Sequence, residues 1–357
     1  MNAASLDRNM DVESTISRAG LTYLDIDNAP FSIHGIWRDG DLYFRIPSEV
    51  CGIFNKSLTP EERSGMLHKS STAGGRVRFK TTSPYVAINV KLDSVYQYTT
   101  MSITGTCGFD VYADGVYAGT YRPPIDLKDG WFESVVDLGV VKEREICIGL
   151  PLYCNIEKMY VGVHGDCEIS PASDYRYKKP VVFYGSSITN GACASRPGMS
   201  YPAILSRMLD CDYHNLGFGG CAKGEDEVAS YVASLDPSVF VYDYDHNAPN
   251  ATHLRATHEK MFLKFREKHP TTPVIMLTAP KVRCEGMWAE RRDVIKATYD
   301  NAIARGDKNV YIIYGTEHFG EVGMDYTADG THPTDLGYYL MAQRIAPVLK
   351  EALEKSE

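Results

Sequence analysis

The apolar residues of the chain follow two different periods, one up to about residue 170 and another from about residue 180. In the first part, apolar positions alternate with other residues over 76–80 and 86–92, as in a strand with one buried face. Asp114 and Gly115 lie between two runs rich in Tyr and Val, which indicates a hairpin. Further short strands are expected over residues 134–139, 145–151 and 158–163. Many short strands without a long helical segment predict a β-sandwich or jelly roll.

The second part alternates between strand and helix patterns. The bare apolar run 181–184 is typical of a buried parallel strand, and Ser200 can cap a helix over 201–209. The patterns that follow predict strands over 212–216, 238–245, 272–280 and 309–315, and helices over 225–235, 253–269, 291–304 and 336–353. Five parallel strands with helices on both faces predict a three-layer α/β/α domain of the flavodoxin-like kind.

A polar segment flanked by prolines, from Ser170 to Pro180, separates the two patterns. Such a composition is typical of a domain boundary. The length of 357 residues also exceeds that of one ordinary domain. We therefore expect an N-terminal β-sandwich domain over residues 1–172 and a C-terminal α/β/α domain over residues 178–357.

Composition and charge narrow the function classes. Hydrophobic residues make up 44% of the chain, which is enough for packed cores. A net charge of −9 without a basic cluster argues against nucleic-acid binding. No apolar run reaches the roughly 20 residues of a membrane span, and residues 1–20 lack the apolar stretch of a secretory signal. The nine cysteines form no CxxC pair, so we expect free thiols and a cytoplasmic location.

Candidate catalytic residues lie directly after the predicted strands. Gly185, Ser186 and Ser187 follow the first strand, and a serine hydroxyl needs an adjacent base and an orienting group to act as a nucleophile. Asp329 and His332 lie between the last strand and the last helix, so both can reach the same sheet edge. His332 would accept the hydroxyl proton and Asp329 would fix its tautomer. These residues alone do not say which serine attacks.

An acyl-transfer site also needs hydrogen-bond donors for the developing oxyanion. The loop after the second strand contains Gly217, Gly219 and Gly220, and a glycine lets a backbone N–H approach a ligand closely. The loop after the third strand contains Asn247, whose amide is a donor, with Asn250 as the alternative. Four candidate pieces of one site thus fall at successive strand ends.

Four short segments resemble, in order and spacing, the sequence blocks of the SGNH (GDSL-type) hydrolase superfamily over about residues 180–350. They are 185–189 (GSSIT), 215–220 (NLGFGG), 245–247 (DHN) and 329–333 (DGTHP). The β-rich first part looks like the jelly-roll domain that precedes the catalytic domain in several SGNH carbohydrate esterases. The family is known for esterases, lipases, thioesterases and deacetylases, usually without a metal.

The resemblance implies a role for each matching residue. It makes Ser187 the nucleophile, Asp329 and His332 its partners, and Ser187, Gly220 and Asn247 the oxyanion donors. Ser186 stands where the GDS signature has Asp, and His246 and Ala248 flank Asn247 in place of the usual Gly and Asp.

A competing pattern is a weak dinucleotide fingerprint. Residues 217–222 spell G-x-G-x-x-A after a strand, and Asp243 and Asp245 lie about twenty residues further on. This fingerprint normally follows the first strand of its unit, so we expect no cofactor. His253 and His258 lie five apart, whereas helical metal ligands prefer a spacing of four, so we expect packing histidines and no metal site.

Other residues in the site-forming loops have open roles. We expect Cys193 and Cys221 to line the pocket as small apolar groups. His246 could reach the site as the neighbour of Asn247. The segment that contains Arg283, Trp288, Arg291 and Arg292 is either a pocket wall, with Trp288 against a sugar, or a solvated helix start.

The leading hypothesis is a serine esterase that removes short acyl groups, acetyl first among them, from a carbohydrate. The alternatives are a lipid or thioester acylhydrolase and a non-catalytic glycan-binding protein. The expected partner is a small-molecule or oligosaccharide ester, with no nucleic acid and no membrane. Nothing in the sequence supports or opposes a homo-oligomer.

Overall fold

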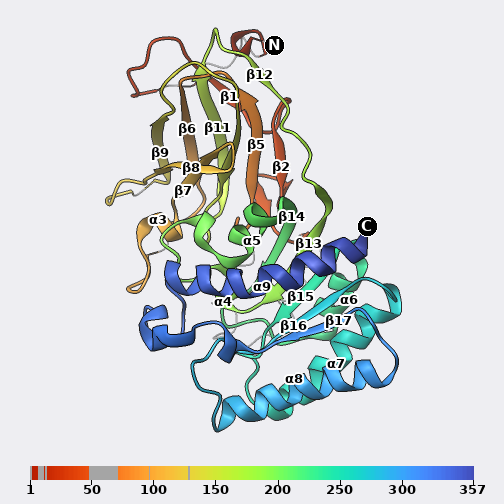
Figure 1. The fold of residues 1–357 in the computed structure, drawn as a ribbon. Helices are drawn as coiled ribbons and strands as arrows, with labels where there is room; N and C mark the ends of the chain where they lie inside the picture. Colours follow the sequence, from red (N-terminus) through yellow and green to blue (C-terminus); the bar gives the residue numbers. More distant parts are fainter. Residues whose placement is uncertain (1, 7–11, 13, 48–70, 96, 128) are drawn as a thin grey trace. The chain divides into compact units, whose positions relative to one another are not determined.

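The computed structural model describes residues 2–6, 12, 14–47, 71–95, 97–127 and 129–357. These residues fall into two compact units (Figure 1). The first unit contains the described residues of 2–45, 71–174 and 195–198, and the second contains 46–47, 175–194 and 199–357. The units are therefore not continuous in sequence, because residues 195–198 belong to the first unit although both of their neighbouring segments belong to the second.

Two antiparallel sheets form the first unit. One has the order β1 (Leu21–Asp25), β11 (Ile156–His164), β6 (Tyr85–Leu92) and β9 (Trp131–Asp137). The other has the order β12 (Ile169–Ser170), β5 (Arg76–Thr81), β10 (Arg144–Gly149), β7 (Phe109–Ala113) and β8 (Val116–Tyr121), with β2 (Ser32–His34) paired to β5. Val86 and Val161 of the first sheet share one buried core with Val77 and Ile148 of the second. The predicted β-sandwich is confirmed.

Smaller elements complete this unit. They are η1 (Ala3–Ser5), the strand pair β3 (Trp37–Asp39) and β4 (Leu42–Phe44), and the short helix α3 (Ile103–Thr106). The predicted hairpin is confirmed, since Ala113 pairs with Val116 across a two-residue turn. Asp114 and Gly115 have φ of 52° and 76°, the positive values that a turn matching the strand twist requires.

The prediction of a single buried face was wrong for β5 and β6. Arg76 and Arg78 are only 4% and 5% exposed, and so is Asn89 at 5%. Arg78 forms an ion pair with Glu145 on the neighbouring strand β10, and Asn89 Nδ2 donates to Glu133 on β9 at 2.8 Å. These polar side chains are buried because each pairs with a residue on a neighbouring strand. The sequence pattern of a single strand cannot show such a pairing.

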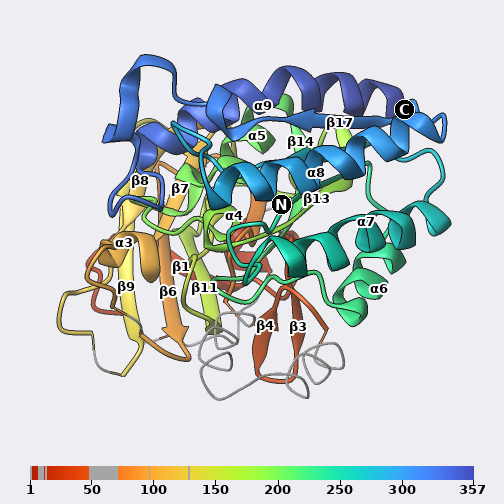
Figure 2. The ribbon, with the colours of Figure 1, turned by 90° about the horizontal axis from the view of Figure 1, so that it is seen from below.

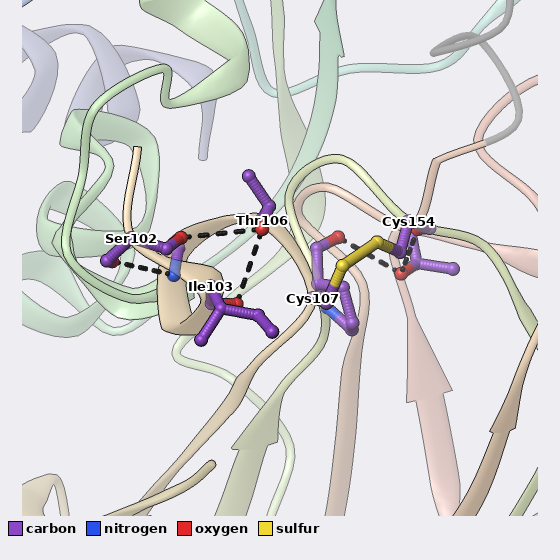
Figure 3. Close-up of a disulfide and its surroundings, with 8 residues drawn as sticks. Ser102, Ile103, Thr106, Cys107 and Cys154 are labelled. Carbon is purple, nitrogen blue, oxygen red and sulfur yellow. Dashed lines mark hydrogen bonds between the residues drawn. A yellow bond between two sulfur atoms is a disulfide. The ribbon is translucent and has the colours of Figure 1, made fainter. Parts of the chain in front are cut away.

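The expectation that all cysteines are free was also wrong. Cys107, at the end of α3, and Cys154, just before β11, form a disulfide with a Cα–Cα distance of 5.3 Å (Figure 3). Both residues are fully buried and lie 47 positions apart, so only the tertiary fold brings them together. The other described cysteines are not disulfide-bonded: Cys147, Cys167, Cys193, Cys211, Cys221 and Cys284. The cytoplasmic location stays a prediction, with one of its premises removed.

The second unit contains a sheet of five parallel strands. Their order is β14 (Cys211–Gly217), β13 (Tyr177–Gly185), β15 (Val239–Asp243), β16 (Val274–Leu277) and β17 (Val310–Ile313). The helices are α4 (Ser187–Asn190), α5 (Tyr201–Leu209), α6 (Asp226–Ser234), α7 (Ala251–Lys268), α8 (Met287–Ala304) and α9 (Asp335–Ser356), with 3₁₀ turns η3 (Pro197–Met199), η4 (Gly315–Glu317) and η5 (Gly320–Tyr326). The predicted α/β/α fold is confirmed.

The strand order fixes the helix layers. Right-handed crossovers place α6, α7 and α8 on one face of the sheet, while the reverse step from β13 to β14 places α5 on the other, where α9 packs against it (Figures 1 and 2). The next strand in sequence after β13, β14, lies on one side of it in the sheet, and the following strand, β15, lies on its other side. Ligand sites form at such a switch point, at the carboxyl ends of the strands. No helix among the described residues is long and apolar enough to cross a membrane.

Candidate active site

Three side chains at the carboxyl edge of the five-stranded sheet form a continuous chain of hydrogen bonds. Ser187 Oγ lies 2.8 Å from His332 Nε2, and His332 Nδ1 lies 2.7 Å from Asp329 Oδ2. The His332 backbone N–H also donates to Asp329 Oδ1 at 2.8 Å, which fixes the carboxylate against the loop that carries the ring. The side chains of His332 and Asp329 are each 26% exposed, so a substrate can reach them. This is the geometry that a serine nucleophile, a base and an orienting carboxylate require.

The charge of Asp329 is stabilised by its hydrogen bonds. Partial burial acts to raise the pKa of this carboxyl, but hydrogen bonds from the backbone and ring of His332 and from the Thr331 N–H outweigh it, and the pKa lies below its usual value. Asp329 is therefore ionised at neutral pH. An ionised carboxylate at Nδ1 keeps the proton on that nitrogen, so Nε2 is left to accept the proton of Ser187.

The structure distinguishes the two adjacent serines. Ser186 is the N-cap of α4: its Oγ accepts from the Ile188 N–H at 3.1 Å, and the residue is only 1% exposed. Ser187 is the first residue of the helix, and its Oγ meets His332. The N–H of a first helical residue has no acceptor within its helix, so the Ser187 N–H is not used by α4.

A buried carboxyl that the sequence analysis did not assign to this site supports the turn below Ser187. Asp243, the last residue of β15, accepts hydrogen bonds from Thr189 Oγ1 at 2.7 Å and Tyr201 Oη at 3.1 Å. Burial raises the pKa of Asp243 to about 7, although these donors lower it in part. A Cβ at Gly185 would lie 2.3 Å from Asp243 Oδ1, so this close approach requires glycine. A polar residue ending an apolar strand was the available signal for such a positioning role.

The glycines of the second loop have different roles. Gly217 donates its N–H to Asn215 Oδ1 at 2.8 Å, and a Cβ there would lie 2.2 Å from the Asn190 backbone nitrogen. Gly217 thus serves close packing against α4. The N–H groups of Gly219 and Gly220 make no hydrogen bond within the described part of the chain. Gly220 is exposed and has a φ of 72°, in the left-handed region that favours glycine.

The two candidate asparagines are also distinguished. Asn247 Nδ2 donates to the Phe218 carbonyl at 2.7 Å, which ties the third loop to the second. A primary amide has two N–H bonds, so one remains for a ligand. Asn250 is instead the N-cap of α7, where its Oδ1 accepts from the His253 N–H at 2.8 Å. Both asparagines thus keep an amide N–H for a ligand, and Asn247 is the one whose amide is tied to the loop of Gly219 and Gly220.

Aromatic and basic side chains lie beside this edge. The His246 ring centroid is 4.7 Å from that of Trp288, and Lys281 Nζ is 4.6 Å from the Trp288 centroid. Burial lowers the pKa of His246 to about 3, with the positive charges of Lys281 and Arg291 acting in the same direction, so His246 is neutral. Arg291 is only 3% exposed and donates to backbone carbonyls of the loop after β15, so the alternative of a solvated helix start does not hold for this residue.

Asp245, from the weak dinucleotide fingerprint, and His258, from the histidine pair, are both buried. Asp245 accepts from the Ala279 N–H at 2.8 Å and is buried, as Asp243 is. His258 is buried beside Tyr242, with ring centroids 4.5 Å apart, and bonds Thr298.

Potential metal ligands gather in one place among the described residues. Cys193, Asp329 and His332 each offer a ligand atom, and the three atoms lie within 4.8 Å of one another. Cys193 is partly exposed, whereas Cys221, the other cysteine of the site-forming loops, is buried.

Two family comparisons cover most of the chain. Residues 178–350 match the GDSL-like lipase/acylhydrolase family. Residues 21–169 match the family described as the N-terminus of SGNH-hydrolase-type esterases. Among curated proteins, none matches the chain.

Solved structures share the architecture of the whole chain. A protein from Bacteroides ovatus, described as a candidate GDSL-like lipase, is 28% identical with a TM-score of 0.79, covering 94% of this chain and 98% of its own. The salicylyl-acyltransferase SsfX3 of a tetracycline biosynthetic pathway is 18% identical with a TM-score of 0.76, covering 94% and 100%. An acetyl xylan esterase from Butyrivibrio proteoclasticus is 14% identical with a TM-score of 0.61, covering 95% and 100%. At identities below 25%, the last two similarities concern the fold alone.

Proposed function

Because the chain belongs to the SGNH/GDSL-type hydrolases, with the esterase N-terminal region ahead of the hydrolase domain, we propose that it is a serine esterase acting on short acyl esters of a carbohydrate. The observation that carries the proposal is the hydrogen-bonded chain from Ser187 through His332 to Asp329. A serine is a weak nucleophile without such a base, and all three groups are present with the required contacts.

The reaction follows from these contacts. Ser187 Oγ attacks the ester carbonyl carbon while its proton passes to His332 Nε2. The carbonyl becomes a tetrahedral oxyanion. When it collapses, the bond to the sugar oxygen breaks, that oxygen takes the proton from His332, and the acyl group stays on Ser187. A water molecule then attacks the acyl-enzyme, with His332 again as the base, and releases the carboxylic acid.

The oxyanion needs donors that are not already used. The N–H groups of Ser187 and Gly220 and the second amide N–H of Asn247 meet this requirement within the described residues. Since loss of one oxyanion donor lowers kcat by about 10²–10³, an Asn247→Ala variant should lose about that factor. An Asn247→Ala variant with wild-type kcat would remove this residue from the oxyanion hole.

Two features support a carbohydrate acetyl ester as the substrate. Solved structures of this architecture include family two carbohydrate esterases from Clostridium thermocellum and Cellvibrio japonicus as well as the acetyl xylan esterase. Beside the triad, Trp288, Lys281 and His246 offer the mixed aromatic and polar surface that sugars favour. The similarity to an acyltransferase raises a second outcome, in which an alcohol replaces water as the acceptor of the acyl group.

The test compares hydrolysis of p-nitrophenyl acetate, butyrate and octanoate by wild type, Ser187→Ala and Ser186→Ala. We expect acetate-selective turnover that Ser187→Ala abolishes, followed by release of acetate from acetylated xylo-oligosaccharides. Loss of the Ser186 cap is expected to cost about 1 kcal/mol of stability while turnover continues. Turnover that survives in Ser187→Ala contradicts the mechanism, and a preference for octanoate moves the substrate to lipids. Acyl transfer to an added alcohol faster than to water would identify a transferase, and tight glycan binding without turnover would identify a binding protein.

A further inference from the structure

A thiol lies beside the base and the carboxylate of the proposed triad. The ligand atoms of Cys193, His332 and Asp329 are all within 4.8 Å of one another. Cys193 is not disulfide-bonded and is partly exposed, and the side chains of His332 and Asp329 are each 26% exposed. A cation in solvent can therefore reach all three groups.

The loop that carries Cys193 is held in place by the rest of the unit. The Ala192 N–H donates to the Ser187 carbonyl at 2.9 Å, and Tyr338 Oη donates to the Ala192 carbonyl at 2.7 Å. Tyr338 is on α9, the helix that begins just after His332. One helix thus fixes the thiol loop and continues directly from the loop of the imidazole and the carboxylate. The three ligands are preorganised, and Cys193 holds its position with a φ of 67°, in the left-handed region.

The donor set has a definite chemical preference. Thiolate, imidazole and carboxylate together suit Zn²⁺ and other thiophilic divalent ions, whereas Mg²⁺ and Ca²⁺ prefer oxygen ligands alone. Zinc-to-ligand distances of about 2.0–2.3 Å place two ligand atoms of one tetrahedral ion roughly 3.3–3.8 Å apart. Groups that already lie within 4.8 Å need to close by only about an ångström, and two of them are on one exposed loop.

We propose that Cys193, His332 and Asp329 form a binding site for a thiophilic divalent cation, Zn²⁺, that inhibits the enzyme. Binding releases the thiol proton to solvent, and the thiolate, one imidazole nitrogen and one carboxylate oxygen bind the ion, with water in the fourth position. Both nitrogens of His332 are used in the active chain, Nε2 toward Ser187 and Nδ1 toward Asp329. Whichever nitrogen binds the metal, His332 loses its hydrogen bond with either Ser187 or Asp329. The inhibition rests on the proposed function, whereas the binding does not.

Binding is measured without reference to activity, on the full chain freed of metal with EDTA and then desalted. Added Co²⁺ should give the near-ultraviolet charge-transfer band of a cobalt thiolate in wild type and in Cys284→Ser. Cys284 is the matched control, since it is also a partly exposed thiol of the second unit that is not disulfide-bonded. The band should disappear in Cys193→Ser, and His332→Ala should weaken Co²⁺ binding. Loss of a residue that merely supports a ligand lowers metal affinity by about 10–100-fold, so loss of a ligand should cost at least that much.

Inhibition is measured as hydrolysis of p-nitrophenyl acetate in increasing Zn²⁺. We expect wild type and Cys284→Ser to lose activity and recover it with EDTA. Cys193→Ser, with inhibition expressed relative to its own rate without metal, should need at least about 10–100-fold more Zn²⁺ than wild type. Mg²⁺ should have no effect. The proposal is overturned if no cobalt–thiolate band depends on Cys193, or if Cys193→Ser is inhibited as readily as wild type. A Cys193-dependent band in an enzyme without esterase activity would support the metal site and refute the esterase instead.

Discussion

The two units place buried carboxyl groups in different surroundings. In the first unit, Asp110 is fully buried and forms an ion pair with Arg196 at 3.0 Å, while the Gly198 N–H donates to the same carboxylate at 2.7 Å. In the second unit, Asp243 and Asp245 are just as buried, but among the described residues neither has an ion-pair partner. They accept hydrogen bonds from neutral hydroxyl and amide groups instead.

The difference separates carboxyl groups that hold a fold together from those that shape a site. The Asp110 pair joins residues 195–198 to β7 and so keeps that segment in the first unit. With no ion-pair partner, burial raises the pKa of Asp243 to about 7. Burial also raises the pKa of Asp245, to about 6, although the Ala279 N–H and the positive charges of Arg291 and Lys281 lower it in part. Asp243 ends β15 and Asp245 lies two residues later, at the sheet edge where Ser187 and His332 meet. Perturbed carboxyls concentrated at one edge of one sheet are what a functional site produces.

The largest expected effect is on catalysis by the second unit. Asp329→Asn should lower kcat for p-nitrophenyl acetate by about 10⁴, because an amide at this position stabilises the wrong tautomer of His332. The melting temperature should barely change, since Asp329 is exposed. Asp137→Asn is the control in the first unit, where an exposed ion pair with Arg18 contributes at most about 1 kcal/mol. Equal kcat in Asp329→Asn and wild type would leave Asp329 without its proposed role.

The next effect is on the stability of the first unit. Asp110→Ala leaves Arg196 without its counter-ion, and breaking a buried ion pair costs about 3–5 kcal/mol. Urea unfolding followed by circular dichroism should show this loss, while kcat per folded molecule stays unchanged. Asp236→Ala is the matched control, because it removes an exposed ion pair with Lys179. A fall in kcat at unchanged stability would contradict the separation between fold-holding and site-shaping carboxyls.

Because the pKa of Asp243 is raised, the free energy of unfolding should fall as the pH rises. An unfolded Asp ionises near 3.9, whereas native Asp243 stays protonated up to about 7. The contribution of Asp243 to the free energy of unfolding is thus fully present below about pH 4 and is lost as the pH rises through 7. A shift of about three pKa units corresponds to about 4 kcal/mol. Asp243→Asn should remove this dependence.

The measurement is the difference in unfolding free energy between wild type and Asp243→Asn from pH 4 to pH 8. Taking the difference cancels the opposite contributions of His246 and His258. Burial lowers the pKa of each to about 3, so their stabilisation is lost as the pH falls below about 6.5. A difference that does not vary with pH would show that Asp243 is ionised in the native protein throughout.

Much of the second unit could be predicted from the sequence because its information is local. A bare apolar run followed by polar residues marks each parallel strand and its carboxyl end, and the order of strands then brings Ser187 and His332 to one edge. The choice between Ser186 and Ser187 could not be made from the residues alone, since two adjacent hydroxyls look alike. It depends on which one the Ile188 N–H reaches.

The first unit was less predictable because its decisive contacts join distant residues. Cys107 and Cys154 lie 47 positions apart without a recognisable spacing, and Arg78 is buried because Glu145 lies opposite on another strand. Likewise, Arg196 follows the turn of Ser187 in sequence but pairs with Asp110 of the first unit. The hydrophobic period and the composition describe one strand at a time, so they do not predict which residues pair between strands.

The smallest effects on stability come from a matched pair of glycines, one in each unit. Gly115 and Gly220 have φ of 76° and 72°, and a Cβ added at either would meet no atom within 4 Å. Alanine at either position should cost about 1–2 kcal/mol of stability through backbone conformation alone. Gly115→Ala should keep the wild-type kcat. Gly220→Ala should also lower kcat, by up to the 10²–10³ of a lost donor, because the new side chain clashes with nothing and only the direction of the N–H can change. If kcat is unchanged while stability falls, the second oxyanion donor is the N–H of Gly219, its neighbour, since the Gly217 N–H is already bonded to Asn215.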